Sequence, residues 1–301
     1  MSEEEYTHKP LVKQRIKGFK TIVPPKSAFT IETAEDFPKL HTLCIASGKR
    51  GGGKSVAIAN FIKRCKDAGY YDKVWLITPT YYSNKSIWDI GEIEEEDVYE
   101  PTMHVLKDIV NMVEAEREEW DLFLKQKEMY KEFKKEIKRR PITEIEPEVL
   151  LEYQDLGFFD GAPEWKYKKE VPPRLGLVVD DVLGTPLMAK PSAGLLNLCI
   201  KHRHVGKGLG LSIFMCVQSY CSQGGINRAI RENTTLLLLF KINQEAQIKK
   251  VMEESDLPLS DEKFMEMCKY CHDKPFNFLL MDFAPKDESK RFRSGWDEYL
   301  S

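Results

Sequence analysis

The stretch GKRGGGKS at positions 48–55 combines four glycines with three cations and ends on a hydroxyl. It fits the phosphate-loop pattern G-x-x-x-x-G-K-[ST] at every fixed position. Glycines let a backbone wrap around phosphate groups and aim its N–H groups at them, at the positive end of a following helix. Lys54 is expected to reach the β- and γ-phosphates of a nucleotide, and the Ser55 hydroxyl is expected to bind Mg²⁺.

The whole loop is therefore expected to contact the phosphates. The expected binding residues are Gly48, Lys49, Arg50, Gly51, Gly52, Gly53, Lys54 and Ser55. The alternative is a glycine-rich turn that happens to precede a Lys-Ser pair.

A second group of chemically capable residues ends the apolar run LVVDD at 177–181. An apolar strand that ends in an acid places one carboxylate near the metal of a phosphate loop, so Asp180 is expected to hold Mg²⁺ through water. Asp181 is expected to orient and deprotonate an attacking water, as a general base does. A simple strand-end turn is the alternative. Two consecutive acids favour hydrolysis over transfer to an acceptor hydroxyl, and ATP with Mg²⁺ are the expected ligands.

Gln218 ends another apolar run, FMCVQSY. If the two runs form neighbouring strands, this amide lies beside the acids and hydrogen-bonds the γ-phosphate or the water. An ordinary strand-end glutamine is the alternative.

Several apolar runs would position these groups. Runs at 40–47, 72–79, 174–184, 208–220 and 234–242 predict strands, with helical patterns such as AGLLNLCIKHRH between them. Strands that alternate with helices predict a largely parallel sheet with ligands outside its carboxyl ends. The expected fold is therefore an α/β, three-layer αβα sandwich of the P-loop NTPase type. A late run at 276–283 is expected to add a strand at an edge.

The charge distribution divides the chain. Residues 91–170 hold 13 Lys and Arg against 23 Asp and Glu, a net of −10, so the remainder carries +7. Apolar residues spaced by three, four and seven predict a long amphipathic helix over 109–140. We expect a lead-in at 1–38 and an ATPase domain at 39–301, interrupted by an acidic helical insertion at 91–170. That insertion is either a lid or a solvated helix covering the sheet.

Other features narrow the class of protein. No apolar run approaches the roughly 20 residues that cross a bilayer, so no membrane span is expected. The acidic start MSEEEYTHKP lacks the apolar core of a signal peptide. Seven scattered cysteines predict reduced thiols in a cytosolic compartment. Cys268-x-x-Cys271-His272 matches haem-attachment and zinc spacings, but no second Cys/His pair accompanies it, and no metal or haem role is expected there.

Six segments occur in a recognisable order: GKRGGGKS, DKVWLITP, LGLVVDD, KHRHVG, FMCVQSY and INRAIRENTTLLLLF. This series resembles the genome-packaging ATPases of poxviruses and other large nucleocytoplasmic DNA viruses, which belong to the FtsK–HerA superfamily of DNA translocases. The resemblance covers about 40–60, 72–80 and 174–250 and leaves the acidic insertion out. Asp181 stands where bacterial relatives usually carry Glu. Because the Asp side chain is shorter, the attacking water must lie closer to the backbone of this residue.

The resemblance implies a homo-oligomeric ring that hydrolyses ATP at its interfaces and drives double-stranded DNA, irrespective of sequence, into a preformed capsid. Capsid or virion proteins would be partners, at an assembly site in the host cytoplasm or on the virion. Such rings use a trans-acting arginine. Arg203 is the first candidate and Arg231 the second, while Arg50 is a candidate in cis; an ordinary ion pair is the alternative for each.

Two lysines, Lys201 and Lys207, are expected to face DNA phosphates in a central pore, or else to lie on a solvated basic loop. Two other functions remain open. One is a P-loop NTPase that acts on a small molecule or a protein, and the other is a virion assembly protein switched by nucleotide.

Overall fold

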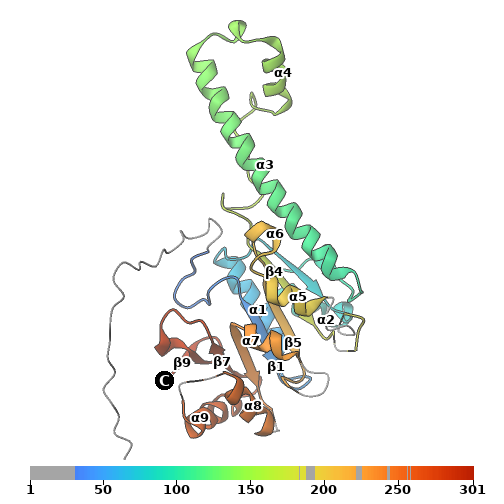
Figure 1. Ribbon diagram of the computed structural model, residues 1–301, viewed down its shortest axis with the longest axis vertical. Helices are drawn as coiled ribbons and strands as arrows, with labels where there is room; N and C mark the ends of the chain where they lie inside the picture. Colours follow the sequence, from blue (N-terminus) through green and yellow to red (C-terminus); the bar gives the residue numbers. More distant parts are fainter. Residues whose placement is uncertain are drawn as a thin grey trace, which may run out of the picture.

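One sheet runs through the body of the computed structural model, which describes residues 31–182, 184–187, 194–221, 226–242, 245–255, 257 and 259–301 (Figure 1). Within these ranges the sheet has nine strands. They are β1 Leu43–Ser47, β2 Lys73–Ile77, β3 Val98–Tyr99, β4 Leu175–Asp180, β5 Ser212–Val217, β6 Leu236–Phe240, β7 Phe278–Asp282, β8 Phe292–Ser294 and β9 Glu298–Leu300.

The strands lie in the order β3-β2-β4-β5-β1-β6-β7-β8-β9. All pairings from β3 to β6 are parallel, and those from β6 to β9 are antiparallel. The prediction of a mainly parallel sheet is therefore confirmed. Two consequences matter for function: β5 separates the loop strand β1 from the acid strand β4, and all three end at the same edge of the sheet.

The position predicted for the late strand was wrong. β7 lies between β6 and β8 and is not at an edge. The reason is that residues 292–300 form two further strands of three residues each, β8 and β9, which are too short to leave an alternating pattern.

Helices cover both faces of the sheet. They are α1 Lys54–Asp67, α2 Tyr81–Ile90, α3 Val105–Arg139, α4 Pro147–Asp155, α5 Leu195–Lys201, α6 Val205–Gly208, α7 Arg228–Asn233, α8 Glu245–Ser255 and α9 Asp261–His272. The described residues also include the short 3-10 turns η1 Glu95–Asp97, η2 Ile142–Glu144 and η3 Glu288–Lys290.

Alternate residues of each strand enter two separate apolar cores. Leu43 and Ile45 of β1 pack on the side of α5, α7, α8, α9 and the start of α3, whereas Cys44 and Ala46 pack on the side of α1 and α2. Every residue of β1, β4, β5, β6 and β7 is buried, as is usual for strands covered on both faces. The expected three-layer αβα sandwich of the P-loop NTPase type is therefore the observed fold.

The helix α3 belongs to the body only at its start. Val105, Ile109 and Val113 enter the core, and the rest of this 35-residue helix projects from the body with α4 at its far end (Figure 1). The helix predicted over 109–140 is thus confirmed. We call residues 116–167 the arm. Even with this length, the described part of the chain contains no helix that is both long and apolar enough to cross a membrane.

Two aromatic clusters hold the arm together. Near its base, Trp120 and Phe123 of α3 pack against Trp165, with ring centroids 5.0 and 5.1 Å apart. Farther out, Phe133 packs against Tyr153 and Phe158 of the returning segment at 4.9 and 5.8 Å. The arm therefore buries its own small apolar cores, separate from those of the sheet.

Cys268 and Cys271 both lie on α9 and are buried in the core beside the sheet. Burial raises the pKa of the Cys268 thiol to about 12, so it stays protonated. These side chains pack as small apolar groups.

Candidate active site

The loop between β1 and α1 takes a shape that requires glycine. A Cβ on Gly48 would lie 2.5 Å from Cβ of Phe240, so no side chain fits where the loop leaves the sheet. Gly53 has φ of +92° and is the residue from which α1 begins. These positions explain why glycine stands at the fixed positions of the motif.

The loop presents backbone donors to whatever binds at the start of α1. No side chain caps this helix, and no acidic residue stands in its first turn. The backbone N–H groups of Lys54 and Ser55 have no acceptor among the described residues. Free N–H groups at the positive end of a helix form an anion site, so the cradle fits the phosphates of a nucleotide.

Lys54 lies inside the loop. Its Nζ donates to the carbonyl oxygens of Gly48 at 2.8 Å and Lys49 at 2.9 Å, and the side chain is buried. Burial lowers the pKa of Lys54, while Cys216, Asp180 and Asp181 oppose that shift. The ammonium is thus held among carbonyls where a polyphosphate would favour its charged form.

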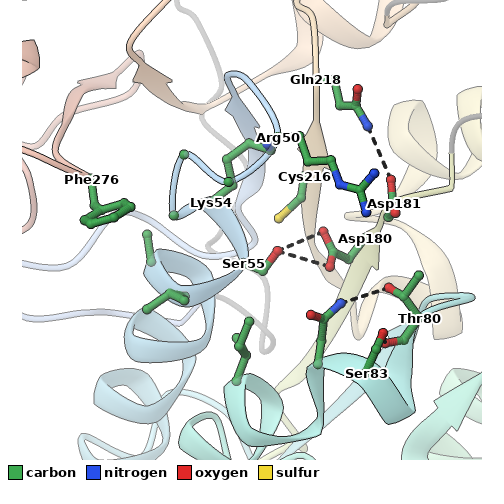
Figure 2. A pocket seen from close by; sticks show the side chains of 17 residues that line it. Arg50, Lys54, Ser55, Thr80, Ser83, Asp180, Asp181, Cys216, Gln218 and Phe276 are labelled. Atoms are coloured by element: carbon green, nitrogen blue, oxygen red, sulfur yellow. Dashed lines mark hydrogen bonds between the residues drawn. The ribbon is translucent and has the colours of Figure 1, made fainter.

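Asp180 and Ser55 meet across the sheet edge. Ser55 Oγ lies 3.2 Å from Oδ1 and 3.1 Å from Oδ2 of Asp180 and donates to them (Figure 2). Burial raises the pKa of Asp180, and the hydrogen bond from Ser55 opposes the shift. A hydroxyl and a carboxylate are hard oxygen ligands, and Mg²⁺ needs only one or two such protein groups besides phosphate and water. The residues present therefore fit the ion.

Asp181 and Gln218 face each other beside this pair. Gln218 was expected beside the acids if the two apolar runs form neighbouring strands. β4 and β5 are neighbours, with Asp180 paired to Cys216, so this condition is met for Gln218. Its Nε2 lies 3.5 Å from Oδ1 of Asp181, a long hydrogen bond (Figure 2). Asp181 is exposed and has φ of +53°, a rare backbone conformation for a residue other than glycine. Its carboxylate lines the same cavity as the loop.

One cavity of about 740 Å³ joins these groups (Figure 2). Its lining includes every loop residue from Arg50 to Ser55, so the main chemical groups predicted from sequence are brought together. The full lining is Arg50, Gly51, Gly52, Gly53, Lys54, Ser55, Val56, Ala57, Thr80, Ser83, Asn84, Ile87, Asp180, Asp181, Cys216, Gln218 and Phe276. Gly48 and Lys49 are not part of this lining, and their carbonyl oxygens accept hydrogen bonds from Nζ of Lys54.

Sequence reasoning missed three parts of this lining. Thr80, Ser83 and Asn84 come from the start of α2, where Asn84 Nδ2 donates to Thr80 Oγ1 at 3.1 Å. The signal was available, because a polar cluster directly follows strand 72–79 and parallel strands end at one edge. Cys216 was hidden in an apolar run, and its thiol hydrogen-bonds Asp180. Phe276 left no local signal.

The three candidate arginines lie in different places. Arg50 points across the cavity toward Asp181 (Figure 2). Arg231 forms a bidentate ion pair with Glu254, at 2.7 and 2.8 Å, and its side chain is only 10% exposed. This is the ordinary ion-pair arrangement, and a role for Arg231 in trans stays a prediction.

Arg203 lies at the amino ends of the parallel strands, opposite the carboxyl ends that carry the cavity. The backbone N–H of Leu211, just before β5, donates to the His202 carbonyl at 2.9 Å, so Arg203 sits beside the amino end of that strand. It is exposed, as are Lys201 and Lys207 nearby. Within one chain Arg203 therefore lies away from the cavity, and a role for it in trans stays a prediction.

The fold and the loop define a P-loop NTPase architecture with one strand between the loop strand and the acid strand. No family model matches the chain, and no curated protein matches it. Solved structures with a similar fold include the DNA-packaging ATPase B204 from Sulfolobus Turreted Icosahedral Virus, at 10% identity and a TM-score of 0.47, covering 86% of this chain and 98% of that one.

Two further structures are similar in fold. The genome packaging NTPase B204 from Sulfolobus turreted icosahedral virus 2, in complex with ATP-gammaS, is 10% identical with a TM-score of 0.45, covering 89% of this chain and 100% of that one. EssC (ATPases 2 and 3) from Geobacillus thermodenitrificans is 12% identical with a TM-score of 0.44, covering 92% of this chain and 48% of that one. At such values the likeness concerns the fold alone, and function is argued from the site.

Proposed function

We propose that this protein is an ATPase that binds ATP with Mg²⁺ on loop 48–55 and hydrolyses it with a water oriented by Asp181. One observation carries the proposal. The loop lysine, a serine–carboxylate pair 3.1–3.2 Å apart and a second carboxylate beside an amide line a single cavity at the carboxyl edge of a parallel sheet. Ligands of α/β sheets bind at that edge.

Each residue has a distinct role in this proposal. The backbone N–H groups at the start of α1 and the Lys54 ammonium would hold the β- and γ-phosphates, and Ser55 and Asp180 would hold the metal. Bound Mg²⁺ would neutralise charge that develops on the phosphate oxygens. Asp181 accepts a proton as the water oxygen bonds to the γ-phosphorus and the bond to the β-phosphate oxygen breaks. Gln218 orients Asp181.

We further propose that hydrolysis drives double-stranded DNA through a ring of these subunits, in packaging a viral genome at a cytoplasmic assembly site. Support comes from the order of six sequence segments that resemble packaging ATPases. The placement of Arg203 is consistent with it, because an exposed arginine at the sheet edge opposite the cavity can reach only a neighbour's nucleotide. Capsid contacts by the arm and DNA contacts by Lys201 and Lys207 belong to the same proposal.

The decisive experiment measures ATP hydrolysis with and without double-stranded DNA, on protein whose mass in solution has been determined. We expect an oligomer whose turnover rises with DNA. Asp181→Asn should still bind ATP but lose turnover by about a hundredfold or more, since a general base contributes that much. Asp160→Asn makes the same chemical change on the exposed arm and should leave turnover unchanged.

The opposite results separate the alternatives. ATP hydrolysis by a monomer that ignores DNA would support an NTPase with a small-molecule or protein substrate. ATP binding without hydrolysis by the wild-type chain would support a nucleotide-switched assembly protein. DNA affinity should also fall steeply with salt if lysines contact phosphates, and a salt-insensitive affinity would contradict the pore.

A further inference from the structure

Phe276 is unusual in two respects. Its side chain is 72% exposed, and its backbone φ is +59°. A positive φ is rare and unfavourable for a bulky side chain. Because the phenyl ring stays mostly in water, the hydrophobic effect stabilises this position little. Neither feature serves the apolar core, in which Phe278, two residues later, is buried. Strained, exposed residues of this kind concentrate at ligand sites.

Strand order fixes where Phe276 stands relative to the acids. It comes just before β7, whose first residue pairs with the last residue of β6 in register Phe240↔Phe278. Phe276 therefore reaches the same sheet edge as the phosphate loop. In the order β4-β5-β1-β6-β7, the acids lie two strands to one side of the loop strand and Phe276 lies two strands to the other side.

Phe276 also touches the loop directly. A Cβ built on Gly53 would lie 3.2 Å from Cβ and 3.5 Å from Cδ1 of Phe276, so the side chain rests on the residue from which α1 begins. Figure 2 shows the ring beside the loop, on the far side of Lys54 from Asp180 and Asp181. The free amides of the loop thus have carboxylates on one side and an aromatic ring on the other.

This arrangement matches the two ends of a nucleotide. The end that reacts must lie near Asp180 and Asp181, because the metal and the water act there. The phosphates then follow the amides around the start of α1, and the opposite end of the molecule leaves the loop beside Phe276. That end is a flat aromatic base, and bases stack on aromatic side chains. Val56, 40% exposed and also in the cavity lining, supplies a second apolar surface.

We infer that Phe276 is the base-stacking residue of this site and that it holds the purine ring of the bound nucleotide. The inference rests on the proposed nucleotide binding and adds the base subsite to it. A phenyl ring offers a face and no hydrogen-bonding group, so it contributes affinity without reading the base edge. Adenine and guanine nucleotides should therefore depend on it equally.

The test compares two probes on the full chain in the presence of Mg²⁺, by calorimetric titration. ATP-gammaS carries a base, and inorganic tripolyphosphate does not. Phe276→Ala should bind ATP-gammaS about tenfold more weakly or worse, because stacking is worth that much per base, and should bind tripolyphosphate as the wild type does. The guanine analogue of ATP-gammaS should lose affinity by the same factor.

Two variants guard the interpretation. Phe276→Asn removes the ring but tolerates positive φ, so it separates loss of stacking from a change of loop conformation and should behave like Phe276→Ala. Phe276→Trp should retain ATP-gammaS affinity, and its fluorescence should change on adding ATP-gammaS but not tripolyphosphate. Phe159→Ala, which removes an exposed phenyl ring on the arm, should change neither affinity.

Two results would overturn the inference in distinguishable ways. If the wild type binds ATP-gammaS and Phe276→Ala binds it equally well, Phe276 does not stack on the base; its ring then serves another purpose, such as a contact between subunits. If the wild type binds neither probe, the proposed nucleotide binding fails together with the inference.

Discussion

The carboxyl edge of the sheet and the arm are held in place by different numbers of chain segments. At the sheet edge, the loop after β1, the starts of α1 and α2, the ends of β4 and β5, and the turn before β7 surround one cavity. The strands behind them are fully buried. The arm is one long helix packed against a single returning segment through two aromatic clusters.

Backbone strain follows the same division. Four described residues other than glycine have positive φ; Asp181 and Phe276, at +53° and +59°, line the cavity, and Glu92 and Lys207 lie in neither the cavity nor the arm. In the arm, all of whose residues are described, only glycine has positive φ. A strained conformation persists only where the surroundings over-determine it. From this difference we expect the packing of the sheet to hold the strained residues of the cavity in place, and we expect the arm to be disrupted without a change at the cavity.

The largest expected effect comes from removing the ammonium group of Lys54, and it is compared with the same kind of change in the arm. Lys54→Ala should lower ATP turnover by at least about a hundredfold, because a buried charge aimed at the transferring phosphate is lost. The measurement is steady-state phosphate release with Mg²⁺. Lys135→Ala, an exposed arm lysine that pairs with Glu132, is the matched control and should keep wild-type turnover. Equal losses in both variants would mean that the arm takes part in the reaction.

The next test disrupts the arm alone. Phe133 is 2% exposed and packs against the rings of Tyr130, Tyr153, Phe158 and Phe159. Phe133→Ala should lower the local stability of the arm by about 3 kcal/mol, the cost of emptying such a site. Hydrogen exchange over 120–160 should rise while turnover and exchange in the sheet stay the same. A parallel loss of protection in β4 and β5 would show that arm and body unfold together.

The smallest expected effect is a loss of folding stability at acidic pH. Both ring nitrogens of His41 are buried, and burial lowers its pKa to about 4, with His202 and Arg203 adding to the shift and the Leu209 carbonyl opposing it. The unfolded chain, with an ordinary histidine pKa near 6.5, binds more protons than the folded chain below neutrality, so the free energy of unfolding decreases as the pH falls. From pH 7 to pH 5 the loss should be about 2 kcal/mol.

Urea titrations at the two pH values measure this dependence. His41→Gln cannot titrate and should show about 2 kcal/mol less of it than the wild type. The arm, at 116–167, contains no histidine, so its hydrogen exchange should not respond in this pH range beyond the change in intrinsic rate. An unchanged dependence in His41→Gln would mean that the histidine is already charged when folded.

Most of the sheet was predictable because its longer strands are recognisable from a few consecutive residues. Buried parallel strands are continuous apolar runs, and five of them were placed within a few residues from the sequence. β3, β8 and β9 were not, since strands of two or three residues leave no periodic signal. The order of the strands could not be read either, because it depends on which apolar runs pair, and paired residues stand up to 192 positions apart in the sequence.

The site divides in the same way. Sequence alone determined the loop at 48–55, the acids at 180–181 and the position of Gln218 at the end of a strand, because each of these signals lies within a few consecutive residues. Only the tertiary structure decided that Ser55 meets Asp180, that Asp181 meets Gln218 and that Phe276 rests on Gly53. The physical reason is that hydrogen bonds and ring contacts act over a few ångströms. These partners stand 125, 37 and 223 positions apart in the sequence, so they come within that range only after the sheet has assembled.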